Sequence, residues 1–169
     1  DSGTFDYFTE AIVGKSKSSR GDYTASEDDN VLVQGVTRDK GAIGYFGFAY
    51  YAENSKKLKA VPIVEKAGKP AVSPSMDTVI NGTYQPLARP IFIYVNAKSM
   101  AKPEVKEFIA YYLANGAKLA REVKYVPLPE NSYKVSADHL AKGKKGTVFG
   151  GVAEVGVTIE DLLKREAKL

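Results

Sequence analysis

The chain opens with Asp1-Ser2-Gly3-Thr4-Phe5-Asp6-Tyr7-Phe8-Thr9-Glu10-Ala11-Ile12, and this stretch predicts an α-helix from about Gly3 to Ile12. Phe5, Phe8 and Ile12 recur at helical spacing and predict one buried stripe. A glycine at position 14 is placed to end the helix.

The start of this helix has the composition of an anion site. Ser2 or Thr4 can serve as the N-cap, because a hydroxyl there accepts from an otherwise unpaired backbone N–H. Gly3 lets the backbone approach a ligand closely. The remaining N–H groups and the helix dipole favour phosphate or sulfate. A Ser-Gly-Thr cap without a ligand is the alternative that these residues leave open.

Composition sets limits on the class of protein. The chain has 169 residues, 44% hydrophobic and 26% charged, which is enough for one core or two modest lobes. It has no cysteine, which excludes a disulfide or a thiolate metal site. The net charge is +4, but the basic runs at 15–20 and 142–145 are short loops, so no nucleic-acid partner is expected. A mild positive field favours the collection of small anions.

Local signals divide the chain into helices and strands. Capping residues and 3.6-residue periodicity predict further helices: 26–40 with Val31, Leu32, Gly35 and Val36 buried, 50–56, 75–82, 102–114 with Val105, Phe108, Ile109, Tyr112 and Leu113 as its buried stripe, 117–123, 130–140 and 158–163. Short β-rich or apolar runs predict buried strands at 42–48, 58–64 and 91–95. Glycine and proline predict a loop at 66–74.

Three strings resemble, in the same order, segments of the phosphate-binding proteins of bacterial phosphate ABC transporters. They are residues 1–12, Gly41-Ala42-Ile43-Gly44-Tyr45, and Tyr84-Gln85-Pro86-Leu87-Ala88-Arg89-Pro90-Ile91-Phe92-Ile93-Tyr94-Val95. The resemblance implies an α/β fold of the type II periplasmic binding protein kind, with two lobes built on central mixed sheets, here incomplete. Residues 1–88 would be the C-terminal part of the second lobe. Residues 89–169 would be the return segment that completes the first lobe, with a glycine-rich tail and a terminal helix in 146–169.

The same resemblance implies a phosphate site between the lobes. On it, Ser2, Gly3 and Thr4 donate hydroxyl and backbone N–H bonds to phosphate oxygens. A carboxylate that accepts from the P–OH group would reject sulfate; Asp1 is the candidate, with a capping or surface role as its alternative. Arg89 has two interpretations, a surface salt bridge or a contact with the ligand or a hinge carboxylate.

The partners implied by the resemblance are inorganic phosphate, the ABC permease of the importer and an N-terminal portion of the same protein. The location would be periplasmic or extracytoplasmic, with any signal peptide upstream of this fragment. Binding of another oxyanion such as sulfate, or a non-transport signalling role on the same fold, is the alternative.

An enzyme is the remaining hypothesis, and the sequence argues against it. Ser2 or Thr4 as a nucleophile would need a base within reach. The only histidine, His139, lies in a polar helix of the other expected lobe and is predicted to be a surface residue. No paired carboxylates or metal-ligand spacing stand out, so no catalytic residue, metal or cofactor is expected.

Overall fold

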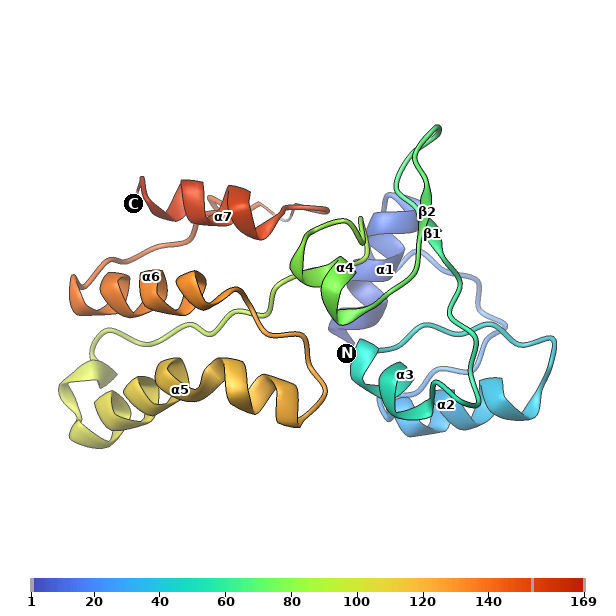
Figure 1. Ribbon diagram of the computed structural model, residues 1–169, viewed down its shortest axis with the longest axis horizontal. Coiled ribbons are helices and arrows are strands. Elements are labelled where there is room, and N and C mark those ends of the chain that lie inside the picture. Colours follow the sequence, from blue (N-terminus) through green and yellow to red (C-terminus); the bar gives the residue numbers. More distant parts are fainter. Residues whose placement is uncertain (1, 153, 169) are drawn as a thin grey trace. The chain divides into compact units, whose positions relative to one another are not determined.

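The chain forms two compact units, shown in Figure 1. The computed structural model describes residues 2–152 and 154–168. Unit 1 comprises Asp1–Ala88 and unit 2 comprises Arg89–Leu169. This division falls at the expected boundary, while the assignment of the units to lobes of a binding protein stays a prediction.

Unit 1 is a set of short helices with one small hairpin. Its elements are α1 (Gly3–Val13), α2 (Asp29–Arg38), α3 (Phe48–Asn54), β1 (Ile63–Val64), β2 (Ala71–Val72) and α4 (Met76–Ile80). The strands β1 and β2 pair antiparallel, with Ile63 opposite Val72. The α2 and α3 helices pack together.

The predicted ends of α1 and α4 are confirmed. Gly14 adopts φ = 80° and its N–H donates to Glu10 O, which closes α1. Ser75 caps α4 through a reciprocal capping box with Thr78. Both signals depend only on residues within a few positions of the helix end.

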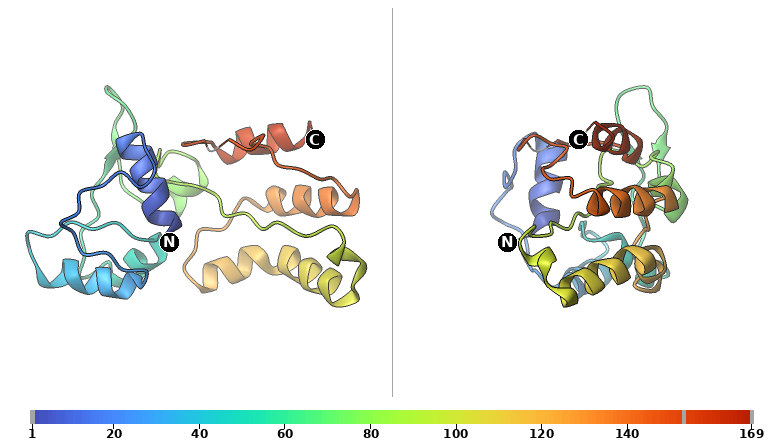
Figure 2. Two further views of the ribbon diagram at one scale, coloured as in Figure 1. Left: turned by 180° about the vertical axis from the view of Figure 1, so that it is seen from behind. Right: turned by 90° about the vertical axis from the view of Figure 1, so that its left-hand side faces the viewer.

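Unit 2 consists of η1 (Ser99–Ala101), α5 (Pro103–Glu122), α6 (Glu130–Ala141) and α7 (Ile159–Glu166). The helix α6 lies between α5 and α7, as Figures 1 and 2 show from opposite sides. Thr158 caps α7 by accepting from the backbone N–H of Asp161. The predicted helices at 130–140 and at the C-terminus are therefore confirmed.

The expected break between helices at 102–114 and 117–123 is wrong, because α5 runs unbroken through Asn115 and Gly116. A glycine inside a helix costs only about 1 kcal/mol relative to alanine. Gly116 also makes room for a neighbour, since a Cβ built there would lie 2.6 Å from Cε1 of Tyr133 in α6. The close α5–α6 approach explains why a glycine stands in mid-helix.

The substitution Gly116→Ala tests this packing. Alanine should gain about 1 kcal/mol of helix propensity but lose about 1–3 kcal/mol by overpacking against Tyr133. We expect a net fall in the free energy of unfolding, measured in urea. Gly35→Ala in α2 is the matched control, because no heavy atom lies within 4 Å of its Cβ position, and it should stabilise. A stabilising Gly116→Ala would contradict the close-approach explanation.

The predicted strands form only in part. Residues 42–47 and 91–95 have no strand assignment, and of 58–64 only Ile63–Val64 pairs. The predicted loop 66–74 contains the partner strand, Ala71–Val72. A strand needs a hydrogen-bonded neighbour, and the described residues supply none to 42–47 or 91–95. Side chains in both runs are accordingly open to solvent, with exposures of 84% for Ile43 and 74% for Tyr94. The expected central mixed sheets are not built by the described residues.

Several burial predictions also need correction. In α2, Val31 and Gly35 are exposed, and Val33 is the buried residue. Ile12 of α1 is exposed, whereas Thr9 is the buried residue of that helix. In the predicted α5 stripe, Phe108 and Tyr112 are exposed while Ile109 is buried. His139 is half-buried rather than on the surface. In α1 and α2 the buried residue is therefore one that the predicted stripe did not include, and in α5 only part of the predicted stripe is buried.

Candidate functional site

The candidate site is the N-terminus of α1. Ser2 is the N-cap, with extended backbone angles of φ = −123° and ψ = 116°. Its Oγ accepts from the backbone N–H of Phe5 at 3.2 Å, and its carbonyl accepts from the N–H of Asp6 at 3.0 Å. Of the two predicted capping candidates, Ser2 takes the role.

The cap leaves donors at the helix entrance. Gly3 and Thr4 are the first two helical residues, whose N–H groups precede the i→i−4 ladder. The Ser2 hydroxyl acts as an acceptor toward Phe5 and keeps its own proton for donation. The Thr4 hydroxyl adds a further donor. The helix entrance thus offers hydroxyl and backbone N–H donors together with the positive end of the α1 dipole.

Buried Thr9 ties this helix to the loop that follows it. Its side chain is 2% exposed, and its Oγ1 donates to Phe5 O at 2.8 Å and accepts from the backbone N–H of Lys17 at 2.8 Å. Lys17 Nζ also lies 3.9 Å from Asp6 Oδ2. The apolar periodicity of 1–12 does not indicate Thr9; a polar residue on an otherwise apolar helix face is the sequence signal that would identify it.

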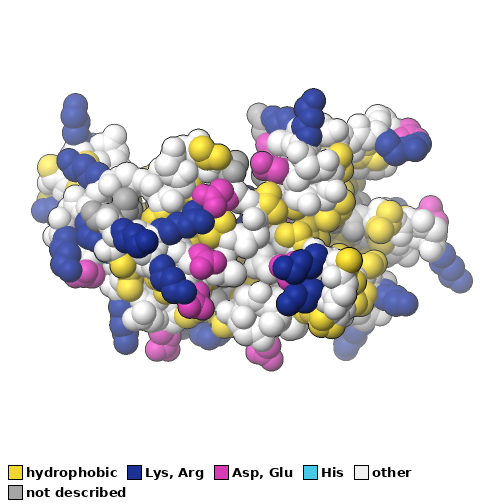
Figure 3. Space-filling view, turned by 90° about the horizontal axis from the view of Figure 1, so that it is seen from above, with side chains coloured by type: hydrophobic (Ala, Val, Ile, Leu, Met, Phe, Trp, Pro, Cys, Tyr) yellow, Lys and Arg dark blue, Asp and Glu magenta, His cyan; other side chains and the backbone are white. Residues whose placement is uncertain are grey.

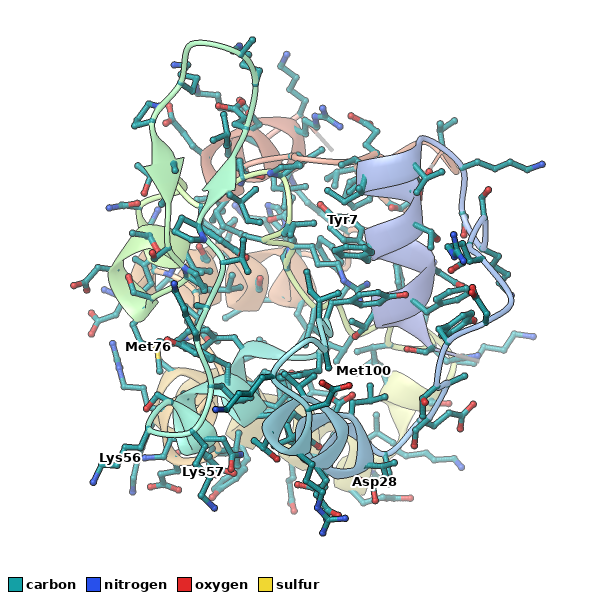
Figure 4. All side chains as sticks on the ribbon, turned by 90° about the vertical axis from the view of Figure 1, so that its right-hand side faces the viewer. Tyr7, Asp28, Lys56, Lys57, Met76 and Met100 are labelled. Carbon is teal, nitrogen blue, oxygen red and sulfur yellow. The ribbon has the colours of Figure 1, made fainter. Side chains whose placement is uncertain are left out.

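Tyr7 ties α1 to the end of unit 1. Its hydroxyl donates to Pro86 O at 2.7 Å and lies 3.4 Å from Ala88 O. Figure 4 shows the labelled Tyr7 on the side of α1 that faces the interior of the unit. This contact joins two of the three family-like strings, residues 1–12 and 84–95.

Aromatic stacking joins α1 to the remaining string. Phe8 stacks on Tyr45 with ring centroids 3.9 Å apart and planes inclined by 8°. Phe5 lies over Tyr23 at 6.1 Å. Burial raises the pKa of the Tyr45 hydroxyl, and the nearby Tyr23 raises it further. The helix α1, which presents the donors, is therefore held in place by contacts with Tyr23, Tyr45 and Pro86.

The other sequence candidates fall elsewhere. Asp1 lies outside the described residues. Arg89 is the first residue of unit 2 and has interactions of its own. His139 also belongs to unit 2, where its Nδ1 lies 3.7 Å from Glu166 Oε2 in α7. Within unit 1, the structure therefore brings together Ser2, Gly3 and Thr4 and adds no histidine to them.

The face of unit 2 that carries α7 mixes charges of both signs. Figure 3 looks down on α7, in its left-hand part, where acidic and basic side chains are interspersed. The ion pairs there include Lys164 Nζ with Glu160 Oε1 at 2.6 Å and Arg165 Nη1 with Glu154 Oε1 at 2.7 Å. The hydrogen bond from Arg165 holds the pKa of the Glu154 carboxyl below its usual value. This pattern differs from the basic stripe that nucleic-acid binding requires.

Two absences hold for residues 2–152 and 154–168. Within these ranges, no cluster of three or more His, Asp or Glu side chains is arranged to hold a metal ion. No helix there has the length and apolar character needed to cross a membrane.

Open helix N-termini with hydroxyl and N–H donors are typical of anion-binding proteins. The family model of a PBP superfamily domain matches residues 1–115, and the chain belongs to this superfamily of binding proteins. The fold class predicted from the sequence is thereby confirmed.

Individual proteins are also similar to this chain in sequence and in structure. The chain is 57% identical to Protein SphX of Synechococcus elongatus over 98% of this chain and 49% of that protein. It is 40% identical to the phosphate-binding protein PstS of Staphylococcus aureus over 82% of this chain and 41% of that protein. Among solved structures, it resembles a possible phosphate binding protein from Planctomyces limnophilus, with a TM-score of 0.69, 51% identity, and coverage of 85% of this chain and 51% of that chain. The chain therefore spans about half the length of the relatives it matches.

Proposed function

We propose that this chain is part of a phosphate-binding protein that captures inorganic phosphate outside the cytoplasm and delivers it to an ABC importer. The observation that carries the proposal is the Ser2-capped entrance of α1, where Gly3 and Thr4 present N–H and hydroxyl donors. Hydrogen bonds from such groups to a charged oxyanion belong to the stronger class. The similarity to the phosphate-binding protein PstS and to the possible phosphate binding protein from Planctomyces limnophilus supports phosphate as the anion.

The proposal assigns units 1 and 2 to different lobes. Residues 1–88 would belong to the second lobe and residues 89–169 would complete the first. An N-terminal portion of the same protein would add further ligand donors. It would also add neighbouring strands with which residues 42–47 and 91–95 could pair. The exposure of Ile91 and Tyr94, 68% and 74%, supports this role, because pairing with a further strand would cover an apolar run that now faces solvent.

Catalysis and signalling are the competing roles. In unit 1 the donors at Ser2 and Thr4 stand without a histidine base, which favours binding over nucleophilic chemistry. Asp1 stays the proposed carboxylate that accepts a hydrogen bond from the P–OH group. It would favour phosphate over sulfate, because sulfate has no proton to donate.

Calorimetric titration with phosphate, and with sulfate as control, tests the proposal. It should be run on a longer protein that joins this chain to the N-terminal portion found in its relatives, and on this chain alone. We expect phosphate-selective binding by the longer protein and much weaker binding by this chain. Absence of phosphate binding by the longer protein would refute the function. Equal, tight binding by this chain alone would refute the need for the remaining portion.

A further inference from the structure

An exposed turn follows α4 and has the sequence Asn81-Gly82-Thr83. Asn81 is the C-cap of α4 and Gly82 adopts φ = 74°, with open space around the position of a Cβ. Thr83 donates two hydrogen bonds to one atom, Oδ1 of Asn81, from its backbone N–H at 3.0 Å and from its hydroxyl at 2.6 Å. Figure 4 shows α4, which carries the labelled Met76, at the edge of unit 1.

This arrangement suits an intramolecular reaction. The N–H of Gly82 donates to Val79 O at 3.2 Å, a single hydrogen bond of this turn. Once that bond opens, the backbone nitrogen of Gly82 can attack Cγ of Asn81, because glycine has no side chain to shield the nitrogen or restrict its rotation. The new N–Cγ bond places negative charge on Oδ1, the atom that both Thr83 donors contact. Preorganised donors at a developing oxyanion lower the barrier to such an attack.

We propose that Asn81-Gly82-Thr83 is a self-modifying site that converts Asn81 to aspartate and isoaspartate. The Cγ–Nδ2 bond breaks, and the side-chain amide leaves as ammonia with the proton that Gly82 gives up. A five-membered cyclic imide remains, and water opens it at either carbonyl. The net reaction consumes one water and releases one ammonia, with no oxidant or reductant.

The chain contains a matched internal control, the second Asn-Gly pair at Asn115-Gly116. This pair lies inside the 20-residue helix α5. The leaving amide of Asn115 donates to Tyr111 O at 2.9 Å, and Gly116 packs against Tyr133. Freeing the backbone nitrogen of Gly116 requires the middle of a 20-residue helix to open, whereas freeing that of Gly82 requires one hydrogen bond of a turn to open, so the same dipeptide should react more slowly at Asn115.

Modification at position 81 has a structural consequence. A carboxylate there would stand at the negative end of the α4 dipole. The isoaspartyl product also lengthens the main chain just before Tyr84, whose N–H donates to Thr78 O at 2.8 Å. Burial of Tyr84 raises the pKa of its hydroxyl. We expect the modified form to release Tyr84, which would bring that pKa back toward its ordinary value.

The test is to incubate the purified chain at mildly alkaline pH and follow its peptides by mass spectrometry, with enzymatic methylation to detect isoaspartate. We expect the peptide containing Asn81 to convert at least about tenfold faster than the peptide containing Asn115. Equal rates, or faster conversion at Asn115, would overturn the proposal.

The substitution Thr83→Val distinguishes the effect of the folded turn from the intrinsic reactivity of the Asn-Gly dipeptide. Valine keeps the shape and the backbone N–H but removes the hydroxyl donor, so conversion at Asn81 should slow several-fold while Asn115 is unaffected. In concentrated urea the difference between Thr83→Val and the unchanged chain should disappear. A rate unaltered by Thr83→Val, or a difference that persists in urea, would overturn the role of the folded turn.

Discussion

In the longer protein, the double substitution Ser2→Ala/Thr4→Val is expected to weaken phosphate binding by a factor of about 10²–10⁴. Each change removes a hydroxyl that can donate to a charged oxygen, and such a bond contributes about 1.5–3 kcal/mol. Two of them amount to about 3–6 kcal/mol, which converts to that range of dissociation constants. Calorimetric titration with phosphate gives the change directly.

The control must account for the cap, since Ser2→Ala also removes the N-cap of α1, at a cost of about 1 kcal/mol of stability. Ser75→Ala/Thr78→Val removes the capping box of α4 in the same unit and leaves the α1 entrance intact. We expect this control to lower the melting temperature while phosphate affinity stays within about twofold. Equal losses of affinity in both variants would show that general destabilisation, and not loss of donors, weakens binding.

The second large effect is expected at Ile109. It is 6% exposed in α5, and Ile109→Ala in this chain should lower the free energy of unfolding of unit 2 by about 2–5 kcal/mol, because it leaves a cavity. Urea denaturation followed by circular dichroism measures the change. A loss below about 1 kcal/mol would contradict the placement of Ile109 in the core of unit 2.

Phe108→Ala is the matched control. It removes a larger side chain from the neighbouring position, but Phe108 is 62% exposed, so the expected cost is below about 1 kcal/mol. Periodicity alone predicts similar costs for both residues, since both belong to the apolar stripe. A cost for Phe108→Ala as large as that for Ile109→Ala would favour the periodicity over the observed burial.

Most helix boundaries could be predicted from the sequence, because capping depends on neighbouring residues. Gly14, Ser75 and Thr158 mark their helix ends by hydrogen bonds that span only a few positions. The hydrogen-bond donors at the start of α1 are local in the same way, since they come from the consecutive residues Ser2, Gly3 and Thr4.

The strands and the buried faces could not be predicted in this way. The apolar run 91–95 has the composition of a strand, but pairing depends on a neighbour from elsewhere in the chain. Gly116 looks like a helix end in the sequence and is instead the point where Tyr133 approaches α5. At 91–95 the described residues offer no neighbour for pairing, and at Gly116 the contact with Tyr133 outweighs local propensity.

By itself, the sequence determined the helix-capping signals, the open α1 entrance and the family resemblance, because each depends on residues close together along the chain. Only the tertiary structure decided how α1 is held, through Thr9 to Lys17, Tyr7 to Pro86 and Phe8 against Tyr45. These contacts join residues 8 to 79 positions apart, and a hydrogen bond or ring stack over such a separation exists only once the chain has folded.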